Sequence, residues 1–379
     1  MSGATRAAEP PGVEKAEVRQ VLGAADGAFS TEPLVHNPKN SVTLGVWRVR
    51  AGRESAILKV LSGEGVERRD AWAASDDPAH WNYWRRESLF YQSDLPAILG
   101  HAGLESPRLL QVVERTPSQT AIWLEDVEGR RGDVWSLDDH RCAARALGRA
   151  HGLAAARTEL RERTWLSRRF LRAYSDKPVR WDLLEDDDTW RHPLVAECLG
   201  ERVRESGRQL HAECEWLQGI MESLPRTLCH LDFWPMNLVR RHNGALVALD
   251  WGFLGDGAIG EDLGNHVPDS AFDLFVPSAK LRRLDEAAFA ALLEGLSEAG
   301  WRGDERLVRL GVCASAVKYV WLLPLMLERA LLEAHSAYGG GDVPDPRTQY
   351  RERGQTLNFL AGWVDEARQL ARVTSLRPA

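Results

Sequence analysis

The residues best suited to chemistry lie close together between positions 230 and 252 of the chain. His230, Asp232 and Asn237 form the pattern H-x-D-x-x-x-x-N, and Asp250 follows thirteen residues after Asn237 in an apolar run. Transfer of a phosphoryl group needs a carboxylate that orients the acceptor hydroxyl and takes its proton, and oxygen ligands that hold Mg²⁺ on the phosphates. The pattern therefore predicts Asp232 as the base and Asn237 and Asp250 as metal ligands.

The spacing also predicts how these side chains meet. The short stretch from Asp232 to Asn237 is typical of a tight loop, and Asn243-Gly244 is a hairpin-turn signal that would return Asp250 to the same place. The alternative is that all three are ordinary polar loop residues. An asparagine and a second aspartate at the right spacing make the complete pattern far more specific than H-x-D alone.

The flanking sequence indicates the elements that must hold these loops. After a helix at 14–22, apolar runs and turn residues predict strands at 42–49, 55–61, 108–114 and 120–125, with a helix at 81–95 that ends at Pro96. Beyond residue 127 we expect helices, at 138–157, 161–174, 193–221 and from 284 to 371, with a loop at 338–346. The prediction is an α+β chain with residues 1–12 disordered, a β-rich lobe at 13–127 and a mainly helical lobe at 128–379.

The segment from His230 to Gly252 resembles the catalytic and metal loops of the aminoglycoside phosphotransferase and choline kinase-like superfamily, a branch of the protein-kinase-like fold. The resemblance extends over roughly residues 34–371. It implies a two-lobed fold, with a nucleotide-binding N-terminal lobe and a C-terminal lobe that carries catalysis and acceptor binding. It also implies that the cofactors are ATP and Mg²⁺.

Other landmarks of the superfamily stand in the expected order. The strand around Lys59 is similar to the one whose lysine binds the α- and β-phosphates, and Glu87 stands where the family places the partner of that lysine. Residues 122–127 resemble the hinge, which implies that Glu125 and Val127 hold adenine through their backbone. The loop at 37–41 lacks a glycine fingerprint, and Ser41 is the best candidate there for a phosphate contact.

For some of these residues, a purely structural role is an alternative to the functional one. Glu54 and Glu64 compete with Glu87 as partners of the lysine. We expect His151, in a segment similar to the family's L-x-x-L-H element, to be structural. We expect Asp262 to hydrogen-bond loop backbone.

The departures from the superfamily pattern carry information about regulation. Leu231 stands where most members have glycine, a substitution that the loop should tolerate. Protein kinases that are controlled by activation-loop phosphorylation carry arginine at that place, and no A-P-E element follows Asp250. The sequence therefore argues against that mode of control.

The acceptor side is less well defined by the sequence. The acidic segment at 182–188 would either bind an amine-bearing acceptor or cap a helix that starts near Thr189. Three further carboxylates stand where an acceptor could be met: Asp256, Glu261 and Asp269. Among the 15 tryptophans, we expect Trp234 and Trp251 to wall the site. Four others could stack on a sugar ring or pack between helices, and we expect most of them to pack in the core: Trp165, Trp181, Trp190 and Trp216.

The charge, the cysteines and the apolar segments argue against several kinds of partner and site. The net charge of −7 disfavours a nucleic-acid partner and permits a cationic acceptor. The five cysteines form no C-x-x-C pair, so neither a disulfide framework nor a zinc site is indicated. We expect a cytoplasmic protein without a membrane partner, because the apolar stretch at 317–327 is too short to span a bilayer and the N-terminus lacks a signal-peptide core.

Three acceptor classes stay open from the sequence. The favoured one is a small hydroxylated metabolite or antibiotic, such as an aminosugar, an aminoglycoside or an amino alcohol. The second is a Ser or Thr hydroxyl of a peptide. The third is no acceptor at all, in a nucleotide-binding regulator, which the complete set of lysine, asparagine and aspartates disfavours. The sequence does not indicate an oligomeric state.

Overall fold

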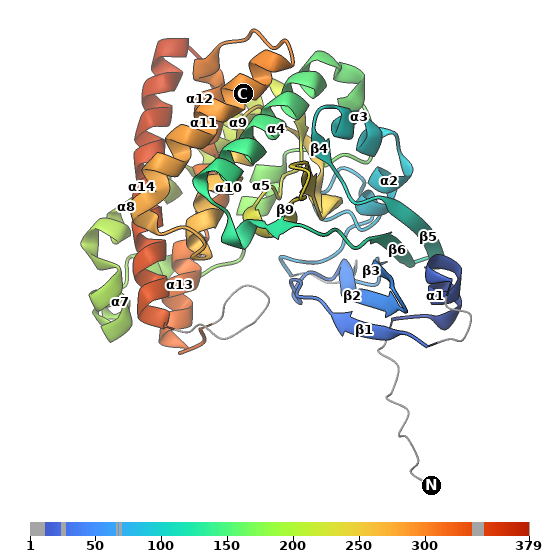
Figure 1. Cartoon of the computed structure of the whole chain (residues 1–379). Helices are drawn as coiled ribbons and strands as arrows, with labels where there is room; N and C mark the ends of the chain where they lie inside the picture. Colours follow the sequence, from blue (N-terminus) through green and yellow to red (C-terminus); the bar gives the residue numbers. More distant parts are fainter. Residues whose placement is uncertain (1–11, 24–27, 66, 68–69, 336–344, 379) are drawn as a thin grey trace.

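A computed structural model of the chain describes residues 12–23, 28–65, 67, 70–335 and 345–378. A five-stranded antiparallel sheet forms one end of the molecule, and helices form most of the rest (Figure 1). This arrangement confirms the predicted α+β class, with the β-rich part first in the chain. The predicted disordered segment at 1–12 lies outside the described residues, except for Gly12.

The strands are β1 (Ser30–Pro33), β2 (Thr43–Ala51), β3 (Glu54–Ser62), β4 (Leu104–Glu105), β5 (Leu109–Thr116), β6 (Gln119–Glu125), β7 (Arg130–Arg131), β8 (Arg226–Cys229), β9 (Leu238–Arg240), β10 (Leu246–Ala248) and β11 (Gly255–Ala258). The α-helices are α1 (Lys15–Leu22), α2 (Arg86–Gln92), α3 (Leu95–His101), α4 (Leu137–Ala156), α5 (Phe170–Ser175), α6 (Asp187–Arg191), α7 (Pro193–Cys198), α8 (Gly200–Ala212), α9 (Cys214–Ser223), α10 (Glu261–Phe272), α11 (Leu281–Glu298), α12 (Glu305–Ala314), α13 (Leu322–Leu331) and α14 (Pro346–Thr374).

The large sheet has the strand order β1-β2-β3-β6-β5 and places Lys59 at its centre. On β3, side chains alternate between two faces, as a strand requires. Leu58 and Val60 enter a small core that α1 closes with Val18. Ile57 and Lys59, on the other face, line a cleft. The alternation therefore aims the lysine into that cleft.

A second, four-stranded sheet carries the hairpin that was expected from Asn243-Gly244. Strands β9 and β10 pair antiparallel, so that Val247 lies opposite Val239. The turn is stabilised by the side-chain oxygen of Asn243, which accepts the Ala245 N–H at 3.0 Å, and Gly244 adopts a positive φ of 88°. The hairpin thereby brings its two ends, near Asn237 and Asp250, to one edge.

The helical part is built around the close pair α4 and α11. A Cβ atom on Gly148 would overlap the backbone of Leu292, and one on Gly295 would overlap the carbonyl of Arg145. Only glycine permits two helix backbones to approach this closely. The pair holds α4 firmly, and α4 carries His151 near its C-terminal end.

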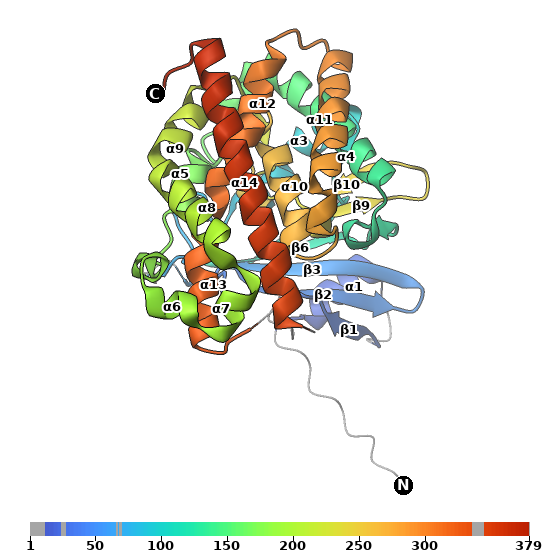
Figure 2. The ribbon, with the colours of Figure 1, turned by 90° about the vertical axis from the view of Figure 1, so that its left-hand side faces the viewer.

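The long C-terminal helix α14 closes the helical layer. Figure 2 shows α14 crossing this face, and it packs on α8, α10 and α12. Because α10 follows the metal-loop region directly, α14 supports the element that shapes one wall of the cleft.

The structure corrects several predicted helix boundaries. The helix expected at 81–95 is shorter, and Pro96 stands in the first turn of α3 instead of ending a helix. Proline fits the first turn of a helix because its missing N–H has no intrahelical partner there. The helix expected at 161–174 is reduced to α5, and Arg169 before it has a positive φ of 51°.

Two further corrections concern the helical part. The helix expected at 193–221 is three helices, and the break after α7 falls where Gly200 adopts a positive φ of 71°. The helix α10 was not predicted, because its sequence contains Pro268 and four polar residues among its first six. The helix predicted at 138–157 begins one residue earlier, at Leu137, where Ser136 and Asp139 form a capping box.

A continuous helical stretch at Glu305–Leu331 is long and apolar enough to cross a membrane by length and composition. It contains the apolar residues 317–327 and is longer than the apolar stretch predicted from the sequence. In its most apolar window, 89% is buried inside the protein. This burial is typical of a helix that forms the core.

Candidate active site

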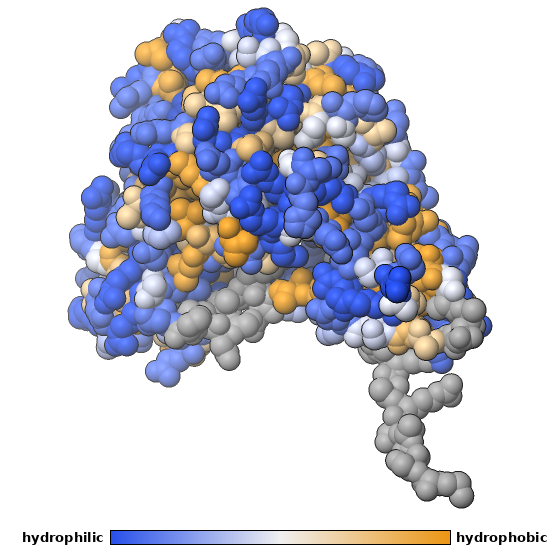
Figure 3. All heavy atoms as spheres, in the orientation of Figure 1, coloured by the Kyte–Doolittle hydropathy of each residue, from blue (hydrophilic) through white to orange (hydrophobic). Residues whose placement is uncertain are grey.

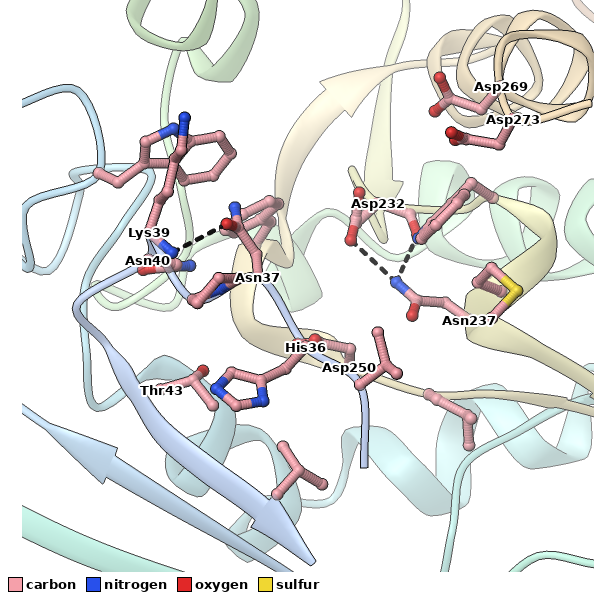
Figure 4. Close-up of a pocket in the computed structure, with 18 of the residues that line it drawn as sticks. His36, Asn37, Lys39, Asn40, Thr43, Asp232, Asn237, Asp250, Asp269 and Asp273 are labelled. Carbon is pink, nitrogen blue, oxygen red and sulfur yellow. Dashed lines mark hydrogen bonds between the residues drawn. The ribbon is translucent and has the colours of Figure 1, made fainter. Parts of the chain in front are cut away.

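Asp232 and Asn237 lie side by side on the loop that follows β8. The Nδ2 of Asn237 donates to the Asp232 carboxylate at 2.8 Å and to the Asp232 backbone carbonyl at 3.1 Å. Asn237 stands at the end of the short 3₁₀ turn Pro235–Asn237. Figure 4 shows both side chains directed into the cleft. The amide nitrogen is thus used within the loop, and the amide oxygen is left for another partner.

Asp250 stands at the end of the β9–β10 hairpin, next to that loop. The N–H of Leu249 donates to the carbonyl of Asn237 at 2.7 Å, which ties the two loops together. Asp250 itself adopts a left-handed backbone conformation, with a φ of 56°. Aspartate tolerates this conformation better than most residues. The structure therefore brings together the three side chains that the sequence singled out.

Lys59 reaches these carboxylates from the sheet. Its Nζ lies 2.6 Å from Oε2 of Glu87 on α2 and 2.8 Å from Oδ1 of Asp250. Burial lowers the pKa of Lys59, but the two carboxylates outweigh burial and raise it above its ordinary value. Neither Glu54 nor Glu64, the competing partners from the sequence, forms an ion pair with Lys59.

The carboxylates of the site differ in pKa because their surroundings differ. Burial raises the pKa of Asp232 to about 7, helped by the negative charges of Asp250 and Asp269 and opposed by Lys318. Burial also raises the pKa of Glu87 to about 7. For Asp250, whose side chain is half exposed, the Lys59 ammonium outweighs burial and holds the pKa below its ordinary value. Asp250 is thus the carboxylate best prepared to stay ionised.

A buried hydrogen-bond network fixes the backbone of the loop before Asp232. The fully buried carboxylate of Asp262 accepts the N–H groups of His230 at 2.8 Å and Leu231 at 2.7 Å, and it lies 3.0 Å from Nε2 of His151. Leu231 has a positive φ of 65°. The superfamily pattern predicts glycine at this position, and glycine adopts a positive φ without strain. Asp262 and His151 therefore act as scaffold, as expected, and their network holds a strained leucine.

The same region contains a group of residues that could geometrically hold a metal ion. Ligand atoms of His151, Cys229 and Asp262 lie within 4.8 Å of one another. The Asp262 oxygens already accept the loop N–H groups, and Cys229 Sγ donates to the Ala258 carbonyl at 3.4 Å. These bonds account for the cluster as a structural network.

The cleft between the sheet and the helices has a volume of about 1140 Å³. Figure 3 shows the hollow on the face that Figure 1 presents. Apolar side chains line the part next to the hinge, including Val46, Ile57, Leu124 and Leu249. Both predicted hinge residues, Glu125 and Val127, line this part as well.

The two hinge residues differ in what their polar groups already bind. The N–H of Glu125 donates to the carbonyl of Arg108, and its side chain pairs with Arg241 at 2.8 Å. The Glu125 N–H is therefore not available to a ligand. Val127 also lines the cleft, and its N–H is the donor in none of the hydrogen bonds found among the described residues.

The structure contradicts the prediction for Ser41. Its hydroxyl donates to the Trp72 carbonyl at 3.0 Å and accepts the Ala74 N–H at 2.7 Å, and its own N–H is bonded to Trp72 as well. Ser41 is not among the residues that line the cleft, because its polar groups staple the loop to residues 72–74. The neighbouring residues Asn37, Lys39, Asn40 and Thr43 line the cleft in its place (Figure 4).

Comparison with known proteins decides the family. The model of the phosphotransferase enzyme family matches residues 46–304, which is well over half of the chain. The chain belongs to the phosphotransferase enzyme family. This match confirms the resemblance drawn from the sequence and the prediction of a phosphotransferase. No curated protein sequence matches the chain.

Several solved structures are similar to this chain at low sequence identity. A choline kinase of Streptococcus pneumoniae is 14% identical, with a TM-score of 0.46, over 94% of this chain and 97% of that one. An aminoglycoside phosphotransferase of Streptomyces rimosus, in complex with ADP and streptomycin, is 18% identical, with a TM-score of 0.43, over 83% and 98%. An amicoumacin kinase is 12% identical, with a TM-score of 0.44, over 95% of each chain.

In this phosphotransferase, α10 supplies the carboxylates of the wall that faces Asp232. Asp269 lines the cleft, as expected, and Asp273 follows it one turn later (Figure 4). Asp256 and Glu261 do not line it. Asp256 forms ion pairs with three arginines: Arg161, Arg168 and Arg226. Glu261 instead accepts the N–H of Ala258 at 2.9 Å.

The acidic segment of the phosphotransferase at 182–188 is a structural element. Asp186 caps α6 by accepting the N–H groups of Asp188 and Thr189. Other members of the segment pair with nearby arginines, such as Glu185 with Arg208. None of the seven residues lines the cleft. The structure thus supports the interpretation of this segment as a helix cap. It does not support the interpretation of the segment as part of an acceptor site, because these residues lie outside the cleft.

The tryptophans divide between the cleft and the core. Trp234 lines the cleft, as expected. Trp251 does not, because its ring is buried and stacks on Phe90 with the ring centroids 4.3 Å apart. The sequence missed two others, Trp72 and Trp321, which line the cleft together with Lys177 and Lys318. No motif marked these residues, since they come from loops and helices of ordinary composition.

Proposed function

We propose that this phosphotransferase is a kinase that moves the γ-phosphoryl group of Mg²⁺-bound ATP to a hydroxyl of a small molecule, with Asp232 as the base. The observation that supports it most is that Lys59, Asp232, Asn237 and Asp250 meet in one cleft. In this proposal, residues 13–127 form the nucleotide-binding lobe. Residues 128–379 form the lobe that carries catalysis and acceptor binding.

The sheet side of the cleft would bind the nucleotide. The apolar end next to Val127 suits adenine, and the Val127 N–H would donate to the base. Lys59 would bind the α- and β-phosphates, with Glu87 holding the ammonium in place from behind. The loop with Asn37 and Lys39 lies on the opposite side of the cleft from Asp232, where it would cover the phosphates (Figure 4).

Asn237 and Asp250 would hold Mg²⁺. The fit rests on their oxygen atoms: Asn237 bonds to Asp232 through Nδ2 and keeps its Oδ1, and Lys59 contacts only Oδ1 of Asp250. Amide and carboxylate oxygens are the ligands that Mg²⁺ prefers. A bound magnesium ion neutralises charge on the β- and γ-phosphates.

Asp232 would orient the acceptor hydroxyl and take its proton. As the acceptor oxygen forms its bond to the γ-phosphorus, the bond from that phosphorus to the β-bridging oxygen breaks, and ADP leaves with the electron pair. Nζ of Lys318, 4.0 Å from Oδ1 of Asp232, favours the ionised carboxylate. The hydrogen bond from Asn237 fixes the direction in which the carboxylate points.

For the acceptor, we infer an aminosugar, an aminoglycoside or an amino alcohol. The carboxylates of Asp269 and Asp273 face the region in front of Asp232 (Figure 4). Arg353 pairs with Asp273 at 3.6 Å, while Asp269 bonds to the neutral amide of Asn265 and keeps its charge for a ligand. An amine of the acceptor would pair with Asp269 while a hydroxyl meets Asp232.

The proposal is tested by measuring ADP release with Mg²⁺ and ATP over a panel of aminosugars, aminoglycosides, amino alcohols and a Ser/Thr peptide. We expect turnover with at least one small amine-bearing alcohol and none with the peptide. Asp232→Asn should abolish acceptor-dependent turnover and leave nucleotide affinity largely intact. Turnover by Asp232→Asn at the wild-type rate would contradict the assignment of the base.

A further inference from the structure

Lys177 is a buried lysine that the proposed mechanism does not use. It follows α5, its side chain is 8% exposed, and it lines the acceptor end of the cleft. Its Nζ has no hydrogen-bond partner among the described residues. An ammonium group with three donors and no acceptor is costly to bury, so its surroundings must stabilise it in another way.

Three aromatic rings surround the Lys177 ammonium. Nζ lies 3.6 Å from the ring centroid of Tyr174, 3.8 Å from that of Trp321 and 4.4 Å from that of Trp72. Ring faces carry negative electrostatic potential, and a cation within about 6 Å of a ring centroid is attracted to it. We call these three rings the aromatic box. The side chain of Lys177 fills the space between these three rings.

The aromatic box is held by a second layer of rings. Trp81 packs edge-on against Trp72, with centroids 5.5 Å apart, and against Tyr174, with centroids 5.4 Å apart. Phe170 stacks on Tyr174 at 5.0 Å. These contacts join the loop that carries Trp72 and Trp81 to α5, so two of the three rings are supported by residues outside the box.

The aromatic box adjoins the proposed base. Both lysines lie near the ring of Tyr174: Nζ of Lys177 is 3.6 Å and Nζ of Lys318 is 5.4 Å from its centroid, and Nζ of Lys318 is also 4.0 Å from Oδ1 of Asp232. Burial and the charge of Lys318 lower the pKa of Lys177, while the ring faces attract its ammonium form. In either protonation state, the side chain occupies the space between the rings.

We propose that Lys177 is a specificity-determining residue: its side chain fills the aromatic box beside Asp232 and keeps the ammonium group of an acceptor out of that box. The amine of an acceptor is then read by Asp269, on the other wall. The link to acceptor choice rests on the proposed function. The occupation of the box by Lys177 does not.

The box is tested by titrating the full chain, without nucleotide, with choline and with its neutral isostere 3,3-dimethylbutan-1-ol. We expect no measurable binding of either compound to the wild type. Lys177→Ala opens a space lined by three rings, and we expect it to bind choline at least about tenfold more tightly than the neutral alcohol, since each ring contributes a cation–π attraction. Melting curves establish that each variant is folded.

Matched variants separate the box from other effects of the substitution. Lys177→Met refills the space with an uncharged chain of similar length, and we expect it to bind no choline. Adding Trp321→Leu to Lys177→Ala removes one ring and should weaken the gained choline binding several-fold. Lys177→Ser repeats the opening of the box with a different small side chain, in case Lys177→Ala does not fold.

The proposal is overturned if the wild type binds choline as tightly as Lys177→Ala, or if a folded Lys177→Ala or Lys177→Ser binds no choline. It is also overturned if the opened box prefers the neutral alcohol. These titrations need no turnover, so a failure here leaves the kinase proposal intact. A failure of the acceptor panel leaves the box intact.

Discussion

Lys59 and Asp250, which lie 191 positions apart in the chain, are joined by a hydrogen bond of 2.8 Å between Nζ and Oδ1. The contact links the centre of the sheet to the end of the β9–β10 hairpin across the cleft. Asp250 and Glu87 together hold the Lys59 ammonium in the cleft.

Replacing Lys59 by methionine keeps the length of the side chain and removes the charge. We expect Lys59→Met to weaken the binding of Mg²⁺-bound AMP-PNP by about 10- to 100-fold, because a charge-assisted hydrogen bond contributes about 1.5–3 kcal/mol. Calorimetric titration measures this change. The control is Lys39→Met, in the loop across the cleft, which should change the affinity by no more than a few-fold. Equal losses in both variants would contradict the role given to Lys59.

We expect Asp262 to contribute more to the free energy of unfolding than an exposed carboxylate does. Asp262→Asn replaces an acceptor of the His230 and Leu231 N–H groups by an amide that can present only one oxygen. We expect the free energy of unfolding to fall by about 2–4 kcal/mol, because buried donors lose their partner. Urea denaturation followed by circular dichroism measures it. Asp138→Asn, on the exposed side of α4, should change it by less than about 0.5 kcal/mol. A similar small effect of Asp262→Asn would refute this account of the loop.

The sequence sufficed to predict the parts of the site that a local pattern encodes. The pattern around Asp232 placed three side chains correctly because a tight loop and a two-residue hairpin turn fix geometry over short distances. Lys59 was found because the strand alternation aims it away from the small core. Ser41 was misplaced because its hydroxyl is taken by Trp72 and Ala74, a contact over more than thirty residues that no local pattern reports.

The acceptor end was less predictable for the same reason. Lys177, Trp72 and Trp321 meet there from three distant segments, and none stands in a motif. The acidic segment at 182–188 attracted attention by composition alone. Its carboxylates are used by a helix cap and by arginines that neighbour it only in the fold.

The acidic segment provides a prediction of its own. Asp186→Ala removes the cap of α6 and should lower the melting temperature, while acceptor-dependent turnover and nucleotide affinity stay within about twofold of wild type. The paired variant Asp269→Asn, on the wall of the cleft, should do the opposite and weaken acceptor binding without a similar loss of nucleotide affinity. Melting curves and KM for an amine-bearing acceptor distinguish the two. A rise in KM with Asp186→Ala alone would restore the acidic segment to the acceptor site.

Glu261 should give the protein a distinct pH dependence of stability. Burial raises its pKa in the folded protein to about 7 from the ordinary value of 4.5. Between these two values the folded state binds one proton more than the unfolded state, so stability decreases as the pH rises through this window. The contribution to the free energy of unfolding is at most about 3.5 kcal/mol, from about 1.4 kcal/mol per pKa unit.

Glu261→Gln should remove this contribution, because glutamine retains an oxygen for the Ala258 N–H and does not titrate. The measurement is the free energy of unfolding from urea titrations at pH 5, 6 and 7 for both proteins. We expect the variant to gain stability relative to wild type as the pH rises. Parallel curves across this range would show that the Glu261 carboxylate is not the source of the pH dependence.

The most direct test of the account is whether Mg²⁺ couples to nucleotide binding through Asn237 and Asp250. AMP-PNP affinity is measured by calorimetry with and without Mg²⁺ in the wild type and in Asp250→Asn. We predict that Mg²⁺ tightens binding to the wild type at least about tenfold, and that the asparagine variant loses most of this gain, since it replaces a charged metal ligand by a neutral one. Tightening by Mg²⁺ that is equal in both proteins, or absent from the wild type, would contradict the proposed site.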